Sequence, residues 1–220
     1  MSNTPIDRHA RHRIRRHPER GSHDRPRAYA ILDAAQIAHV GFAVDGQPFV
    51  IPMLYARLGD RILLHGGVSS RLMQHLASGA PCTLAVTHMD GWVLARSHFN
   101  HSVNYRSVVV FGRACVIDEP AQKAAALAHL VDALIPGRAA ETRPGDAQEL
   151  AATVLLAVEI EDLSVKTREG GPKDHPDDLV SAAWAGVIPL SQVPGFPIPS
   201  PDLPAGVNLP SYLGGMPMSA

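Results

Sequence analysis

Two short polar segments of this 220-residue chain contain the residue types from which a cofactor site could be built. Residues 98–112 read HFNHSVNYRSVVVFG and join two His, two Asn, a Tyr and an Arg to a hydrophobic strand. Residues 63–72 read LLHGGVSSRL, where a strand ends at two glycines and a helix begins. A folded domain does not need this much polarity at the start of a strand. Together the segments indicate a site for a phosphorylated planar cofactor, which we interpret as a flavin.

The second segment has the composition of a phosphate site. Glycines such as Gly66 let the backbone approach a ligand, and the first N–H groups of a helix point outward toward an anion. Ser69 and Ser70 can donate hydroxyl hydrogen bonds, and Arg71 can bind a phosphate through two parallel N–H groups. We also expect Ser69 to cap the helix. An ordinary helix start with a surface Arg is the alternative.

Pro52 interrupts an otherwise regular strand in residues 48–60, PFVIPMLYARLGD. Proline has no N–H group, so the backbone of this strand is not expected to be fully paired there. An unpaired strand edge offers free C=O and N–H groups to the polar rim of a flavin ring. A β-bulge would explain the proline equally well.

Other residues suggest a metal or a disulfide, and we expect neither. His98 and His101 have the spacing of a metal-binding pair, but they lie in a loop rich in Asn and Ser rather than on a helix with a third ligand. Cys82 and Cys115 each lie inside an apolar run without a CxxC motif. They are predicted to be buried free thiols of a protein in a reducing compartment.

Composition sets limits on the class of protein. The length and the 45% hydrophobic content suit one soluble domain with an attached tail. A formal net charge of −1 gives no global field to attract nucleic acid or an anionic membrane. Residues 1–23 form a basic arm, expected to be solvated or packed on a partner subunit, with nucleic-acid binding as the less favoured alternative. No signal peptide and no apolar run of about 18–20 residues is found, so we expect a cytoplasmic protein.

The elements that must position the polar segments are mainly strands. Asp-Gly pairs at 45–46 and 90–91 and a Gly-Asp pair at 59–60 predict tight turns between apolar runs. Such turn-linked strands favour an antiparallel sheet of six to seven strands, closed into a barrel within residues 24–169. The predicted strands are 37–44, 49–57, 61–65, 81–88, 92–96, 105–117 and 153–166.

A few helices are inserted between these strands. One begins near Pro26, a short one ends at Gly79, and an amphipathic one covers 119–134. Asp146 and Glu149 form a capping box for another. Residues 170–220 are rich in proline and lack regular structure, yet they contain apolar side chains such as that of Trp184. This C-terminal segment is expected to pack on the barrel or on a partner subunit.

Three blocks, in the order in which they occur, resemble one known family. They are DGQPFVIPMLYARLGDRILLHGGVSSRL from residue 45, LARSHFNHSVNYRSVVVFGRA from residue 94 and WAGVIPL from residue 184. The chain is similar over residues 11–212 to the pyridoxamine 5'-phosphate oxidase-like FMN-binding split-barrel proteins, and within them to the flavin-nucleotide-binding, nitroimidazole-reductase-type branch. The resemblance implies a split β-barrel, a homodimer, and FMN held between the two subunits.

The resemblance also implies positions for the flavin contacts. His65 and Gly66 would lie beside the ring and the ribityl chain, and Ser70 with Arg71 would bind the phosphate. Asn104 and Ser107 would reach the ring, and Trp184 would close over the site. The strand expected along the ring contributes Val50, Ile51, Pro52, Met53 and Tyr55.

Departures from the family pattern bear on the activity. Leu72 stands where the oxidases have a phosphate-binding Lys, and Ser107 stands where they have a Gln. The chain ends in a Pro-rich LPSYLGG segment instead of the Trp and Arg that bind pyridoxal phosphate. Oxidation of pyridoxamine phosphate is therefore not the predicted reaction.

The predicted function is that of an FMN-binding flavoprotein that uses NAD(P)H to reduce a small electron-poor molecule, nitroaromatic or quinone-like. No residue is assigned a catalytic role, because a flavin would carry out the hydride chemistry itself. A non-catalytic protein that stores or senses flavin is an alternative. A member of the same barrel that binds F420 or haem is another, with His65, His98 or His101 as a haem ligand.

Overall fold

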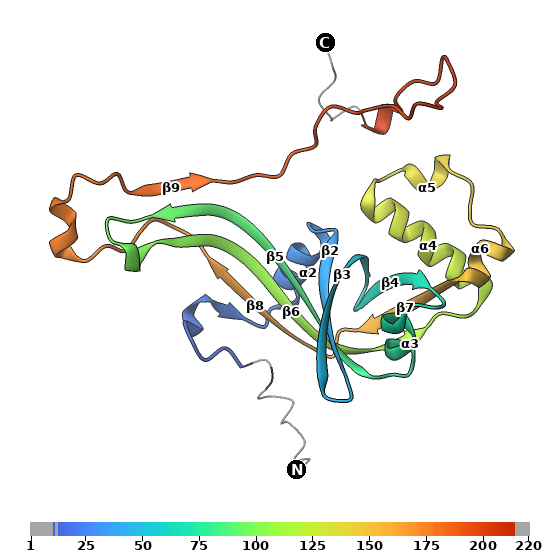
Figure 1. The fold of residues 1–220 in the computed structure, drawn as a ribbon, viewed down its shortest axis with the longest axis horizontal. Helices are drawn as coiled ribbons and strands as arrows, with labels where there is room; N and C mark the ends of the chain where they lie inside the picture. The colour runs from blue at the N-terminus through green and yellow to red at the C-terminus, as the bar shows by residue number, and fades with distance from the viewer. Residues whose placement is uncertain (1–10, 12, 214–220) are drawn as a thin grey trace.

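The computed structural model of the chain describes residues 11 and 13–213. Its strands form one antiparallel sheet in the order β1-β8-β6-β7-β4-β3-β2-β5-β9, and an additional β5–β6 pairing closes six of them into a barrel (Figure 1). The mainly β, split-barrel prediction is confirmed. The strands are β1 (Gly21–Ser22), β2 (Ile37–Val44), β3 (Gln47–Leu58), β4 (Arg61–Gly67), β5 (Pro81–Leu94), β6 (Ser102–Val116), β7 (Thr153–Glu159), β8 (Asp162–Arg168) and β9 (Gly186–Pro189).

Tight turns connect the first barrel strands as predicted. Asp45 and Gly46 both have positive φ, 50° and 81°, as the two central residues of a type I′ hairpin require. Gly59, with φ 60°, turns β3 into β4. The sequence pattern was sufficient here because each turn residue needs only its own backbone conformation.

The described residues contain nine strands rather than six or seven. The two predicted strands 81–88 and 92–96 are one strand, β5, so the turn expected at 90–91 is wrong. Met89 faces Tyr105 and Gly91 faces Asn104, so Asp90 is an extra residue in a β-bulge. Main-chain pairing with β6 on one side and with β9 on the other keeps the strand extended.

The single strand predicted at 153–166 is also wrong. It is two strands, because the chain leaves one part of the sheet at Ile160 and enters another. β7 pairs with β4 and β6, whereas β8 pairs with β6 and β1. The Ile160 N–H donates to the Asp60 carbonyl and the Glu161 N–H donates to the Phe111 carbonyl, which fixes the corner.

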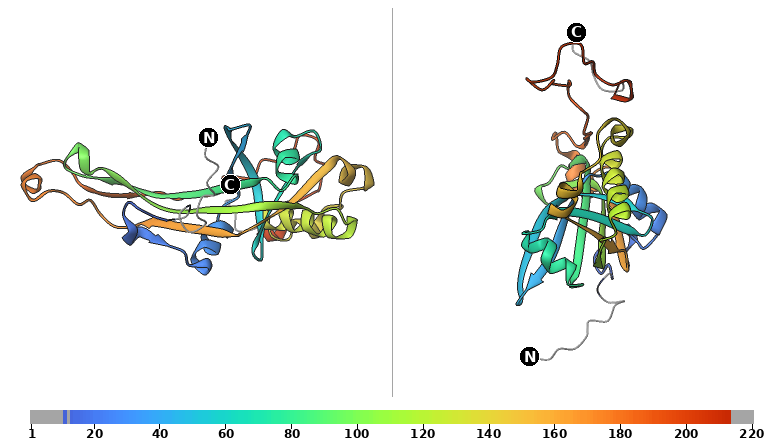
Figure 2. Two further views of the ribbon diagram at one scale, coloured as in Figure 1. Left: turned by 90° about the horizontal axis from the view of Figure 1, so that it is seen from below. Right: turned by 90° about the vertical axis from the view of Figure 1, so that its right-hand side faces the viewer.

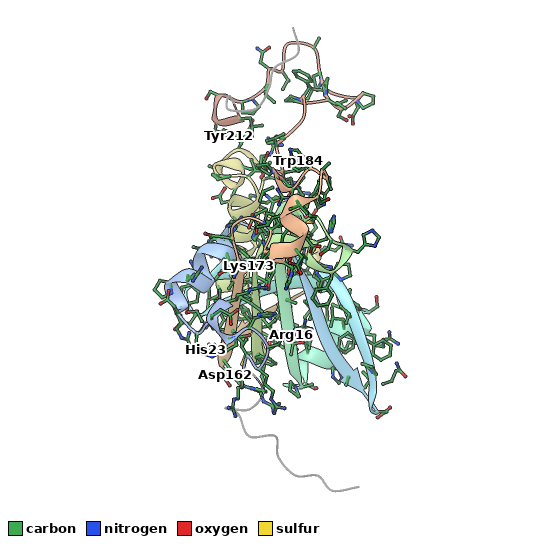
Figure 3. The ribbon with its side chains drawn as sticks, turned by 90° about the vertical axis from the view of Figure 1, so that its left-hand side faces the viewer. Arg16, His23, Asp162, Lys173, Trp184 and Tyr212 are labelled. Carbon is green, nitrogen blue, oxygen red and sulfur yellow. The ribbon has the colours of Figure 1, made fainter. Side chains whose placement is uncertain are left out.

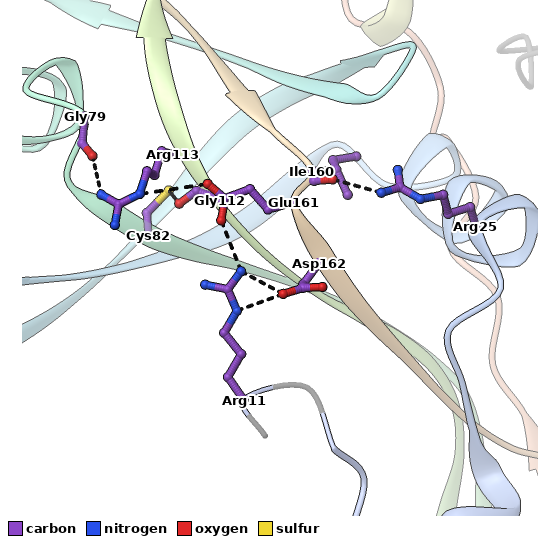
Figure 4. Close-up of polar contacts among 9 residues, drawn as sticks. All are labelled: Arg11, Arg25, Gly79, Cys82, Gly112, Arg113, Ile160, Glu161 and Asp162. Atoms are coloured by element: carbon purple, nitrogen blue, oxygen red, sulfur yellow. Dashed lines mark hydrogen bonds and ion pairs between the residues drawn. The ribbon is translucent and has the colours of Figure 1, made fainter. Parts of the chain in front are cut away.

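The basic N-terminal segment is attached to this corner. The Arg11 guanidinium donates to Asp162 and Glu161, and Arg25 donates to the Ile160 carbonyl (Figure 4). Gly21 and Ser22 extend the sheet beside β8. Within the described residues, the end of the predicted arm is therefore part of the sheet.

Helices close the barrel and cover one side of it. α2 (Arg25–Asp33) and α3 (Arg71–Ala77) bury Leu32 and Met73 in the barrel core. α4 (Pro120–Leu134), α5 (Arg138–Glu141) and α6 (Ala147–Ala152) lie together at one end (Figure 1). The predicted capping box of α6 is present. No helix among the described residues is long and apolar enough to cross a membrane.

Both cysteines are free, and they differ in exposure. Cys82 is buried and close to the Gly112 carbonyl, and burial raises the pKa of its thiol to about 11. Cys115 is exposed, so the prediction that it is buried is wrong. Ala114, next to it on β6, points into the core, and strand alternation turns Cys115 outward.

β5 and β6 continue beyond the barrel as a long curved hairpin, which we call the extension (Figures 1 and 2). β9 pairs with β5 near its tip, at residues 91–94. After β9, residues 191–209 are almost all exposed, and the chain runs back toward the helical end, where Arg138 donates to the Tyr212 hydroxyl (Figure 1). That residues 170–220 pack on a partner subunit stays a prediction.

Candidate functional site

The outer half of β3 has an edge that no described strand covers. β3 pairs with β2 from residue 47 to 54, but with β4 only from Tyr55 onward. The Tyr55 N–H donates to the Gln36 carbonyl on the β2 side, so alternation directs the main-chain groups of Val50 and Pro52 to the open edge. Pro52 therefore breaks no ladder hydrogen bond. The prediction of an incompletely paired strand is confirmed.

Arg71 lies across this opening. Its guanidinium carbon is 4.1 Å from the centroid of the Phe49 ring on β3, while its backbone begins α3. The Arg71 side chain stacks on Phe49, and no ion pair of Arg71 is found among the described residues. A stacked guanidinium still presents N–H donors at its edge to a phosphate.

Ser70, not Ser69, caps α3, so that detail of the prediction is wrong. The Ser70 Oγ accepts from the Met73 N–H at 3.4 Å and still has its own hydroxyl hydrogen to donate. Ser69 is exposed in the preceding turn. Both serines and Arg71 thus stand next to one another where β4 ends.

Gly66 is required by packing as well as by any ligand. A Cβ at this position would lie 2.8 Å from the Met73 Cγ, because α3 packs directly on β4. A Cβ at Gly67 would meet nothing within 4 Å. The two glycines predicted a close approach of the backbone to a neighbouring group. At Gly66 that neighbour is the Met73 side chain of α3.

His65, on β4, has a buried ring nitrogen. Its Nδ1 atom is buried and has no hydrogen-bond partner among the described residues. Its position on β4 follows the last residue paired with β3, Leu64 opposite Tyr55. A buried polar atom without a partner costs free energy, so it is a candidate for contact with a ligand.

Strand alternation divides the other predicted β3 residues between two faces. Ile51, Met53 and Tyr55 pack toward the barrel core, and Tyr55 donates to the Leu32 carbonyl at 2.5 Å. Burial raises the pKa of the Tyr55 hydroxyl. Val50 and Pro52 point outward, and Val50 is 67% exposed. A ligand at this edge would meet the side chains of one face only.

Asn104, Ser107 and Trp184 lie elsewhere, on the extension and its neighbours. The Asn104 Oδ1 accepts from Arg168 at 2.5 Å, and the Ser107 hydroxyl donates to the Lys166 carbonyl at 3.1 Å. Trp184, labelled in Figure 3, precedes β9, and β9 lies along the extension, away from α3 (Figure 1). Within one chain the structure does not bring these three residues together with Ser70 and Arg71.

The bulge at Asp90 gives the extension one continuous outward face. Tyr105 and Val103 are two residues apart on β6, so they share a face, and their partners Met89 and Trp92 must share it too. Ile188 of β9 lies opposite Trp92 and continues this row. The exposed fractions along the row are 44% for Met89, 46% for Trp92, 37% for Val103 and 39% for Ile188.

Three polar residues of this region were not predicted from the sequence. Arg168 is buried, and it donates to Asn104 and to the carbonyls of Gly170 and Gly171. Burial lowers the pKa of its guanidinium. Glu169 separates Arg168 from the glycines at 170 and 171, and no local sequence pattern indicated that Arg168 would be buried.

Arg96 and Asp174 fix the loop at the tip. The Arg96 N–H donates to the Asp174 carboxylate at 2.8 Å, and its guanidinium donates at 2.7 Å. The N–H donation and the guanidinium hold the pKa of Asp174 below its usual range. The two residues are 78 positions apart in sequence, so no local pattern could have paired them.

In the part of the chain that the structure describes, no group of three or more His, Cys, Asp or Glu side chains could hold a metal ion. His98 and His101 are both exposed in the tip loop.

Comparison with known proteins identifies the family. A family model described as pyridoxamine 5'-phosphate oxidase matches residues 24–167, which include the whole barrel. The chain belongs to this family. Among curated proteins none matches the chain with significance. The three sequence blocks indicated a resemblance to this family, and the family match confirms it.

Solved structures extend the comparison over nearly the whole chain. The FAD and haem binding protein from Mycobacterium smegmatis is 41% identical, with a TM-score of 0.85, covering 90% of this chain and 97% of the other. The flavocytochrome Anf3 from Azotobacter vinelandii is 37% identical, with a TM-score of 0.87, covering 95% and 97%. A candidate 5-nitroimidazole antibiotic resistance protein from Bacteroides thetaiotaomicron has a TM-score of 0.57 at 19% identity, covering 66% and 85%, and shares the fold.

Proposed function

We propose that this chain is a redox protein that binds a flavin and a haem. The observation that carries the proposal is its similarity, over at least 90% of both chains, to an FAD and haem binding protein and to a flavocytochrome. These matches reach beyond the residues 24–167 of the family model. They therefore include parts of the molecule that lie outside the barrel.

The residues at the β3 opening fit a flavin. Arg71 and Ser70 supply a guanidinium and a hydroxyl for a phosphate, and the open edge of β3 supplies main-chain groups for the ring. His65 supplies a ring nitrogen that has no hydrogen-bond partner among the described residues. A bound flavin would supply the hydride and single-electron chemistry, while the chain binds and orients it and excludes water.

FAD is the proposed form of the flavin, because the Mycobacterium protein is described as binding FAD. FMN, the form that the sequence resemblance implied, is the competing outcome. NAD(P)H-dependent reduction of a nitroaromatic or quinone-like molecule remains a proposal about the reaction. A protein that binds flavin without turnover is the alternative to it.

We also propose that the chain forms a homodimer. Val50 on β3 and Ile37 on β2, 67% and 48% exposed, point to the same outward face as Met89 of the extension. Exposed apolar side chains that share one sheet face can form a protein contact. Light scattering would then give twice the mass of the chain, and the mass of one chain would contradict the dimer.

The proposal is tested by the absorption spectrum of the full chain as purified and after addition of FAD, FMN and ferric haem. We expect a flavin band near 450 nm and a haem Soret band, with mass spectrometry of the released flavin identifying FAD. Saturable binding of neither cofactor would refute the proposed function. NAD(P)H consumption with a nitroaromatic or quinone acceptor then separates a reductase from a flavin carrier.

A further inference from the structure

The tip loop of the extension holds a histidine prepared for metal ligation. The His101 Nδ1 lies 2.8 Å from the Ser97 carbonyl oxygen. A carbonyl oxygen can only accept, so Nδ1 carries a proton, and in the neutral ring Nε2 is then the nitrogen with the free lone pair. His101 is exposed, which leaves Nε2 accessible. Ligating histidines in proteins usually have this arrangement, with the second ring nitrogen donating to a carbonyl or carboxylate.

The backbone places His101 on the apolar face of the extension. His101 is extended, with φ −60° and ψ 143°, and it leads directly into β6. Alternation therefore puts His101 and Val103 on the same face, where Val103 lies opposite Trp92 and Trp92 lies opposite Ile188. An imidazole beside an exposed row of apolar side chains suits a planar apolar macrocycle with a metal at its centre.

The loop also contains an exposed aromatic ring and is held rigidly at its base. Phe99, in the 3-10 turn His98–Asn100, is 94% exposed, which is uncommon for a large aromatic side chain. The residue before Ser97, Arg96, is fixed by two hydrogen bonds to Asp174. The Arg96 Nε is buried and has no acceptor among the described residues, so a donor for a carboxylate is available close to the loop.

We propose that the Nε2 atom of His101 is an axial ligand of the haem iron, with Phe99 and the row of Trp92, Val103 and Ile188 in contact with the macrocycle. This assignment rests on the proposed haem function. It separates the haem site, on the extension, from the flavin site at the β3 opening.

Two other histidines compete for this role, and the structure favours neither. His98 is exposed, and no hydrogen bond among the described residues fixes its tautomer. His65 has a buried Nδ1 without a partner, so ligation through Nε2 would leave a buried N–H without an acceptor. His101 is the one of the three whose second ring nitrogen already has its partner.

The test is a titration of ferric haem into the full chain, followed by the Soret band. The variants are His101→Ala and His101→Gly, with His98→Ala as the matched control and His65→Ala as the test of the competing ligand. We expect the His101→Ala variant to lose the ligand-shifted Soret band. Its haem affinity should fall by roughly 10- to 100-fold, the range typical of removing a residue that supports a metal ligand. Free imidazole should restore the band in His101→Gly.

The controls decide between the histidines. His98→Ala should keep the Soret position of the unmodified protein, and far-UV circular dichroism should show each variant folded. An unchanged spectrum in His101→Ala, or loss of the band in His65→Ala, would overturn the assignment. If the unmodified protein binds no haem, both the proposed haem function and the assignment of His101 fail. Should His101→Ala not fold, His101→Gln gives the same readout with a side chain of similar size.

Discussion

Strands β5 and β6 run through both the barrel and the extension, and their side chains are buried very differently in the two regions. Within the barrel, Val86 of β5 and Val108 of β6 are opposite each other and almost fully buried. Beyond the bulge, Trp92 and Val103 are also opposite each other, yet both remain more than one-third exposed. The barrel strands are enclosed by their own chain, whereas the extension presents an apolar face for something else to cover.

This contrast separates two kinds of site. The opening at β3 carries the polar side chains of Arg71, Ser70 and His65, which are positioned by α3 and by strands that pack on the barrel core. The extension carries an exposed apolar row with a single oriented imidazole, that of His101. A flavin phosphate suits the first environment, and a porphyrin suits the second.

The largest expected effect is at the flavin phosphate. Arg71→Ala should weaken flavin affinity by about 1–3 kcal/mol, the scale of hydrogen bonds to a charged group. Arg61→Ala is the matched control, because Arg61 is an exposed arginine on β4 that pairs with Glu159. Fluorescence quenching of the added flavin gives both dissociation constants. Equal constants for the two variants would show that Arg71 does not bind the phosphate.

A second effect concerns the packing behind that site. In Gly66→Ala the new methyl would lie 2.8 Å from the Met73 side chain, so the free energy of unfolding should fall by about 1–3 kcal/mol. Gly67→Ala, with open space around its Cβ, should change it by less than about 0.5 kcal/mol. Urea denaturation of both variants makes the comparison. A loss of stability at Gly67 as large as that at Gly66 would contradict the packing argument.

Local signals in the sequence were enough to predict the barrel. The Asp-Gly turn at 45–46 needs two positive φ values, and the apolar periodicity of α3 places Met73 in the core whatever surrounds it. Pro52 indicated an open strand edge because proline lacks the donor itself. In each case the residue's own chemistry determined the outcome.

The errors came where tertiary contacts decide. Asp90-Gly91 is as typical of a turn as of a bulge, and only pairing with β6 and β9 keeps the strand extended. The apolar run at 153–166 alternates through the corner at Ile160, which is set by hydrogen bonds to Asp60 and Phe111. The pairing of Asn104 with Arg168, 64 residues apart, left no local trace.

The central claim is that two separate regions of the chain hold two cofactors, and one measurement tests it most directly. Apoprotein of the unmodified chain, Arg71→Ala and His101→Ala is mixed with FAD and ferric haem together, separated from free cofactor, and its 450 nm and Soret absorbance recorded. We predict that Arg71→Ala loses flavin and keeps haem, and that His101→Ala loses haem and keeps flavin. Loss of both cofactors in either folded variant, or of neither in both, would contradict two separate sites.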